Sequence, residues 1–61
     1  MVDERTSLLE QIRQAFAEGD EDRGYDLVAE AIERLAMPTD IVARALSAGL
    51  EAWHPAPLGT L

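Results

Sequence analysis

The sequence predicts an all-α fold: a small bundle of three helices at about residues 7–18, 20–36 and 38–53, followed by an extended C-terminal tail. Apolar residues recur every three or four positions through most of the chain, which is the spacing of helices with one buried face. Gly19-Asp20 and Met37-Pro38 divide this pattern into three segments. Connections this short fold neighbouring helices back on each other. We therefore expect one helical domain at residues 1–54 and a separate tail at 55–61.

The first helix is expected from about Ser7 to Glu18. Its apolar positions have the helical spacing of a buried stripe: Leu8, Leu9, Ile12, Ala15 and Phe16. Ser7 and Glu10 fit the capping box that opens many helices, and Asp3 is an alternative start. Gly19 stands where a left-handed residue is needed to end the helix.

The second helix is expected to begin at Asp20, a favourable N-cap residue. Its apolar stripe is Tyr25, Val28, Ile32 and Leu35, widened by Leu27 and Ala31. Gly24 costs about 1 kcal/mol relative to alanine inside a helix, so we expect another helix to cross closely there. The polar side carries Asp22, Asp26, Glu30 and Glu33, which indicates a solvated face or a docking face for a basic partner.

The third helix is expected to start at Pro38, because proline suits the first turn of a helix and disfavours helical backbone in the residue before it. Thr39 or Asp40 can cap its first amides. The apolar stripe is Ile41, Val42, Ala45, Leu46, Gly49, Leu50 and Trp53. His54-Pro55 is expected to end the helix.

Length and charge limit the classes of function. The chain has 61 residues, no cysteine, and a net charge of −7 from twelve carboxylates against five arginines. A chain this short buries only about 60% of its unfolded surface, so it depends on close helix packing or on a partner. Its acidity disfavours nucleic acid and anionic membranes. No apolar run reaches the ~20 residues of a membrane span, and no signal peptide is recognisable. We expect a cytoplasmic protein.

The sequence contains no recognisable set of residues for catalysis. A nucleophile needs a base within hydrogen-bond reach, and the single histidine, His54, lies beside a proline at the expected end of a helix. The acidic run at residues 19–24 lacks the ligand spacing of a calcium loop, and the four glycines are too dispersed to cradle a phosphate. We expect no enzyme activity, no metal or cofactor site and no small-molecule substrate.

Binding of a protein is the expected role, either a partner or a second copy. Trp53 is the only tryptophan; it either covers one end of the helical core or anchors an interface. The tail is either disordered, packed over the helices or docked to a partner, and its two leucines are spaced by three. The candidate partner-binding residues are Trp53, Leu50, Leu46, Leu58 and Leu61.

One family resemblance rests on the central stretch. Gly19-Asp20 precedes a helix bearing Leu27-Val28 and Glu30-Ala31, and a proline break precedes Asp40-Ile41-Val42, Leu46 and Gly49-Leu50. This order resembles the helical cap domain of corrinoid proteins, a four-helix bundle above a cobalamin-binding domain. The resemblance covers three of the four helices, at about residues 8–53.

Two departures limit what the resemblance implies. Residues 54–61 stand where the family's fourth helix begins, and the cobalamin domain with its Asp-x-His-x-x-Gly motif is absent. No corrinoid-contacting residue is therefore carried over. The resemblance implies an apolar face that the tail, a second copy or another protein would cover.

Two functional interpretations remain open. The first is a non-enzymatic interaction module that resembles a truncated corrinoid-protein cap. The second is a short acidic helical carrier or precursor peptide, in which residues 53–61 (WHPAPLGTL) are recognised or modified by an enzyme or a shell protein.

Overall fold

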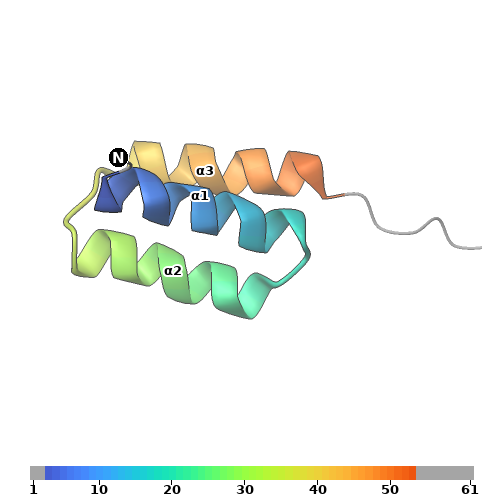
Figure 1. Cartoon of the computed structure of the whole chain (residues 1–61), viewed down its shortest axis with the longest axis horizontal. Helices are drawn as coiled ribbons and strands as arrows, with labels where there is room; N and C mark the ends of the chain where they lie inside the picture. The colour runs from blue at the N-terminus through green and yellow to red at the C-terminus, as the bar shows by residue number, and fades with distance from the viewer. Residues whose placement is uncertain (1–2, 54–61) are drawn as a thin grey trace, which may run out of the picture.

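The computed structural model describes residues 3–53, and this part consists of three helices (Figure 1). They are α1 (Glu4–Ala17), α2 (Glu21–Glu33) and α3 (Thr39–Ala52). The helix α1 packs along both of the others, whereas α2 and α3 touch each other only weakly. The predicted all-α bundle of three helices is confirmed, and the predicted tail at 55–61 lies outside the described residues.

The start of α1 corrects one expectation. Asp3 is the N-cap, and its side chain accepts a hydrogen bond of 2.6 Å from the amide of Arg5. The amide of Ser7 donates to the carbonyl of Asp3 at 2.9 Å, so Ser7 already lies inside the helix. The predicted capping box of Ser7 and Glu10 is therefore wrong, and the alternative start at Asp3 is confirmed. Asp3 serves equally well as a cap and adds a turn, with Glu4 placing negative charge at the positive end of the helix.

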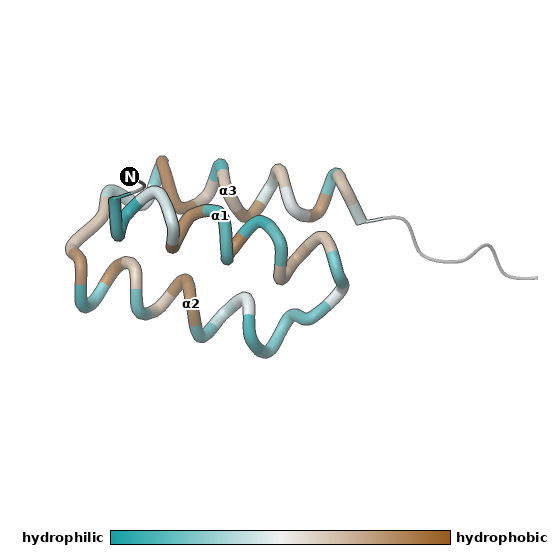
Figure 2. The backbone as a smooth tube through the Cα atoms, in the orientation of Figure 1, coloured by the Kyte–Doolittle hydropathy of each residue, from teal (hydrophilic) through white to brown (hydrophobic). Residues whose placement is uncertain are grey.

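The turn between α1 and α2 follows the predicted chemistry. Gly19 has a φ of +79°, its amide donates to the carbonyl of Phe16 at 3.1 Å, and the amide of Asp20 donates to that of Ala15 at 2.9 Å. These two bonds form a Schellman motif. The side chain of Asp20 then accepts from the amide of Arg23, which makes Asp20 the N-cap of α2. Figure 2 shows this turn as a mostly hydrophilic segment.

The connection between α2 and α3 is longer than predicted. The helix α2 ends at Glu33 instead of residue 36, and Ala36 turns the chain with a φ of +51°. Pro38 is the N-cap of α3 and no side chain caps the first amides, so the expected capping by Thr39 or Asp40 is wrong. The amide of Met37 instead donates back to the carbonyl of Ala31 at 3.1 Å. This bond closes the chain reversal two residues before α3 begins.

Replacing Ala36 with glycine is expected to stabilise the protein. A left-handed backbone costs an L-residue about 1–2 kcal/mol, and glycine would relieve this strain. Glycine also gives the unfolded chain more conformational entropy, which offsets about 0.4–1 kcal/mol of the relief. The expected net gain in the free energy of unfolding is about 1 kcal/mol, measured by urea unfolding. As a control, Ala29→Gly in the interior of α2 should cost about 1 kcal/mol. An Ala36→Gly protein no more stable than the parent would contradict the left-handed turn.

The core is built around one aromatic ring. Phe16 is 1% exposed and points from α1 toward two glycines. A Cβ atom at Gly24 of α2 would lie 2.6 Å from Cε2 of Phe16, and a Cβ atom at Gly49 of α3 would lie 2.7 Å from its Cβ. The expected close crossing at Gly24 is thus confirmed, and α1 is the helix that crosses. The buried apolar residues are Leu8, Ile12, Ala15, Phe16, Ala31, Met37 and Val42.

Candidate interaction face

The inward side of α2 is a line of small residues. Gly24 and Ala31 are buried and lie seven positions, or two turns, apart. Tyr25 and Ile32 each follow by one position, about 100° around the helix, and are 57% and 38% exposed. Their predicted place in the buried stripe is therefore wrong. The reason is that the large ring of Phe16 fills the space above Gly24, which leaves Tyr25 to pack its ring edge-on at 5.2 Å from that of Phe16.

The helix α3 has the same arrangement. Val42 and Gly49, seven positions apart, are its buried residues. Leu50 follows Gly49 and is 45% exposed, whereas Ile41 precedes Val42 and is 42% exposed. The predicted place of Ile41 and Leu50 in a buried stripe is therefore wrong. Because Ile41 and Leu50 lie on either side of the inward line, they belong to opposite flanks of α3.

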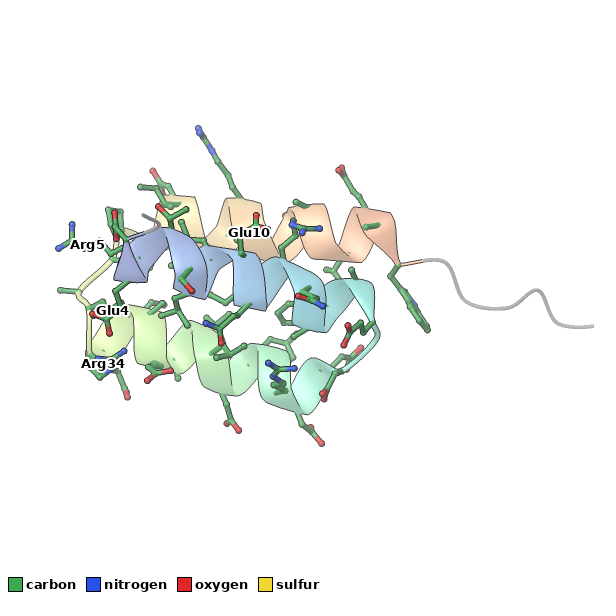
Figure 3. The ribbon with its side chains drawn as sticks, viewed as in Figure 1. Glu4, Arg5, Glu10 and Arg34 are labelled. Carbon is green, nitrogen blue, oxygen red and sulfur yellow. The ribbon has the colours of Figure 1, made fainter. Side chains whose placement is uncertain are left out.

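An ion pair shows which flank of α2 faces α1. Arg34 of α2 reaches Glu4 of α1 at 2.7 Å, and Figure 3 shows the two side chains pointing toward one another. Arg34 lies three positions after Ala31, on the flank opposite to Ile32. The flank of Tyr25 and Ile32 is therefore the opposite one, and it meets α1 through the contact between the rings of Tyr25 and Phe16.

The direction of the helices brings Leu50 to the same side. The chain reverses between α2 and α3, so the two helices run in opposite directions and both lie against α1 (Figure 1). In an antiparallel pair of helices, the residues that come one position after the inward residues of each helix lie on the same side of the pair. Leu50 thus shares a side with Tyr25 and Ile32, while Ile41 lies on the flank beside α1.

Trp53 lies at the end of this side. It is the C-cap of α3 and is 42% exposed. A Cβ atom at Gly19 would lie 3.0 Å from Cη2 and Cζ3 of Trp53, so the six-membered ring rests on the turn between α1 and α2. Trp53 covers that end of the bundle with part of its ring and keeps the rest open to solvent.

We call the apolar surface between α2 and α3 the α2–α3 face; it comprises Tyr25, Ile32, Leu46, Leu50 and Trp53. Leu46 is half-buried and packs against the core, and the other four are exposed. Leu46, Leu50 and Trp53 are predicted partner-binding residues that the structure brings together. Leu58 and Leu61 lie outside the described residues. Tyr25 and Ile32 are not among the predicted partner-binding residues. The spacing of seven between the small residues Gly24 and Ala31 is the sequence feature that indicates which side of α2 faces the core.

The charges around this face are almost all negative. Glu21 precedes Tyr25 by one turn, Glu33 follows Ile32, and Glu51 follows Leu50. Two further exposed carboxylates lie on the outer sides of the same helices, Asp22 of α2 and Asp40 of α3. Among residues 3–53, none of these five forms an ion pair. Arg44 is the one arginine of α3.

The ion pairs of the described residues lie elsewhere, on α1 and on the flank of α2 beside it. Arg13 pairs with Glu10 at 3.1 Å, and Arg34 pairs with Glu4 at 2.7 Å and with Glu30 at 3.0 Å. The hydrogen bond from Arg13 holds the pKa of Glu10 below its ordinary value, and the hydrogen bond to Glu4 raises the pKa of Arg34. Arg13 and Arg34 are thus paired with glutamates away from the α2–α3 face.

The α2–α3 face offers apolar contact. In the part of the chain that the structure describes, no pocket is found and no cluster of side chains is arranged to hold a metal ion. No helix within residues 3–53 has the length and apolarity to cross a membrane. What the geometry provides is a row of large apolar side chains with carboxylates along its edges.

No protein-family model, curated protein or solved structure matches this chain. The resemblance to the corrinoid-protein cap therefore stays a prediction.

Proposed function

We propose that the protein is a non-enzymatic helical interaction module, acting in the cytoplasm, which binds a protein partner or a second copy through the α2–α3 face. One observation supports this most strongly: four large apolar side chains are exposed on one side of two helices that hardly touch. Contiguous exposed apolar surface of this kind marks interaction sites. Tryptophan and tyrosine, which are enriched among the residues that dominate binding energy, stand at one end of it.

The packing of the bundle supports the same proposal. Each helix must bury its apolar stripe against another element. The helix α1 has two neighbours, but α2 and α3 each have only α1 as a close neighbour. A further helix laid between α2 and α3 would cover Tyr25, Ile32 and Leu50 and complete a bundle of four. The proposed resemblance to corrinoid-protein caps fits this, because those domains contain four helices.

A matched pair of substitutions on α3 tests the proposal. Leu50→Ser removes an apolar side chain from the α2–α3 face, and Ile41→Ser removes an equally exposed one, 42% against 45%, from the other flank. A partner would be isolated from the source cell with the full chain, identified, and titrated against the purified variants. Because central apolar anchors are worth about 2 kcal/mol or more, Leu50→Ser should weaken binding by at least about tenfold. Ile41→Ser should leave binding unchanged.

Equal binding by the two variants would contradict the proposed face. Self-association is measured in parallel by sedimentation at several concentrations, with the same two variants. A chain truncated after His54 distinguishes the proposed face from the carrier or precursor interpretation, which assigns recognition to the tail. If truncation abolishes partner binding or modification while Leu50→Ser does not, the tail is the functional element.

A further inference from the structure

We propose that the α2–α3 face binds a basic amphipathic helix of another protein. This inference rests on the proposed docking role of the face and adds the chemistry of its occupant. It follows from three features of the described residues: the sign of the charges along the edges, the placement of the arginines, and the shape of the apolar surface.

The edges of the face carry negative charge without internal compensation. Glu21 lies one turn before Tyr25, Glu33 and Glu51 directly follow Ile32 and Leu50 in the sequence, and Asp22 and Asp40 add negative charge on the outer sides of the same helices. Within residues 3–53 these carboxylates have no ion-pair partner. An interface matches opposite potentials at its edges, so the complementary surface carries lysine or arginine on both sides of its apolar stripe.

The arginines of this chain do not supply the positive charge that would balance these carboxylates. Arg13 and Arg34 are paired with glutamates on α1 and on the α1-facing flank of α2. Arg23 lies one position before the inward residue Gly24, so it also belongs to the flank beside α1. Only Arg44 of α3 is near the acidic edge.

The same charges disfavour a second copy as the occupant. A two-fold symmetric dimer brings the same patch of each subunit together. Here it would place the acidic edge of one copy beside that of the other, in chains that each carry a net charge of −7. Like charges juxtaposed across an interface oppose association.

The shape of the face fits a helix. Its apolar residues run along two antiparallel helices, from Tyr25 to Ile32 and from Leu46 through Leu50 to Trp53, each about two turns long. The described surface has no pocket for a compact ligand. An apolar stripe at positions i, i+3, i+4 and i+7 of a docked helix has the matching length and lies along the surface between two such helices.

Two synthetic peptides test the proposal against the full chain. Each has about 18 residues, longer than the ~12–15 residues below which isolated helices are marginal, with the same leucine stripe and no tryptophan. One carries lysine on both sides of the stripe and the other carries glutamate at the same positions. Trp53 is the only tryptophan of the protein, so its fluorescence reports binding at the face, and calorimetry gives the affinity.

The basic peptide is expected to bind at least tenfold more tightly than the acidic one, and its binding should weaken steeply as ionic strength rises from ~0.01 M to ~0.5 M, because salt screens exposed charges. Leu50→Ser should abolish binding and Ile41→Ser should not. The double variant Glu21→Gln/Glu33→Gln should weaken binding several-fold. Glu10→Gln/Glu18→Gln removes the same charge from α1 and is expected to have little effect.

Failure of the basic peptide to bind would overturn this inference, as would equal binding of the two peptides. Equal binding that still depends on Leu50 would leave the docking role of the face intact and reject only its charge preference. Self-association that depends on Leu50 would show that a second copy of the chain, and not a basic helix, occupies the α2–α3 face. The docking role itself is tested by the partner titration: it is rejected if Leu50→Ser leaves partner binding unchanged.

Discussion

Replacing Phe16 with alanine is expected to lower the free energy of unfolding by about 3–5 kcal/mol, the usual cost of removing a buried aromatic side chain. Its ring is 1% exposed and fills the space between α1, Gly24 of α2 and Gly49 of α3. A Cβ atom at Gly24 would meet this ring, and one at Gly49 would meet the Cβ atom of Phe16, so removing the ring leaves a cavity beside α2. A chain of 61 residues has a total stability of roughly 3–9 kcal/mol. The expected loss is therefore a large share of the total stability and equals all of it at the lower end of that range.

Circular dichroism during urea and thermal unfolding measures this loss. Phe16→Leu keeps most of the apolar volume and is the matched control, with an expected loss clearly smaller than that of alanine. Ile41→Ala, at a half-exposed position of α3, should cost less than either. A Phe16→Ala protein that unfolds within about 1 kcal/mol of the parent would contradict the placement of the ring at the centre of the core.

Replacing Gly49 with alanine is expected to destabilise the protein by about 2 kcal/mol, although alanine is the better helix former by about 1 kcal/mol. A Cβ atom at this position would lie 2.5 Å from the carbonyl oxygen of Arg13 and 2.7 Å from Cβ of Phe16. The oxygen belongs to the backbone of α1, so it cannot move aside as a side chain can. The added methyl group would force α1 and α3 apart along their whole contact.

The control for Gly49→Ala is Ala48→Gly, at the exposed neighbouring position of α3. It should lose about 1 kcal/mol from helix propensity alone. If Gly49→Ala and Ala48→Gly both lower the free energy of unfolding, helix propensity cannot explain the loss at Gly49 and its cause is steric. Chemical unfolding of the two variants under the same conditions measures these free energies. A Gly49→Ala protein more stable than the parent would show that α1 and α3 do not approach this closely.

The boundaries that depend on local chemistry were predictable from the sequence. Gly19 and Asp20 form a turn whose bonds involve only residues within one turn of α1 and α2. The start of α1 was harder because Asp3 and Ser7 are both good N-caps, and the sequence offers no local reason to prefer one. The predicted end of α2, at residue 36, is three residues late because no glycine marks the end: Ala36 adopts the left-handed conformation that glycine usually supplies.

The candidate face depends on contacts between helices, which a periodic pattern describes incompletely. Tyr25 and Ile32 have the spacing of a buried stripe, yet Gly24 and Ala31 beside them face the core because Phe16 needs the space above Gly24. Likewise, Ile41 and Leu50 both fit the apolar stripe of α3. We infer that Ile41 lies on the side of α1 from the ion pair between Glu4 and Arg34 and from the opposite directions of α2 and α3. Only the packed structure separates the two flanks.

The α2–α3 face is tested most directly by chemical-shift mapping of the isotope-labelled full chain during titration with the basic amphipathic peptide. The largest changes are expected at the amides of Tyr25, Ile32 and Leu50 and at the indole N–H of Trp53, with little change at Ile41 and Glu10. Changes centred on α1 and Ile41, or confined to residues 54–61, would contradict the assignment of the face.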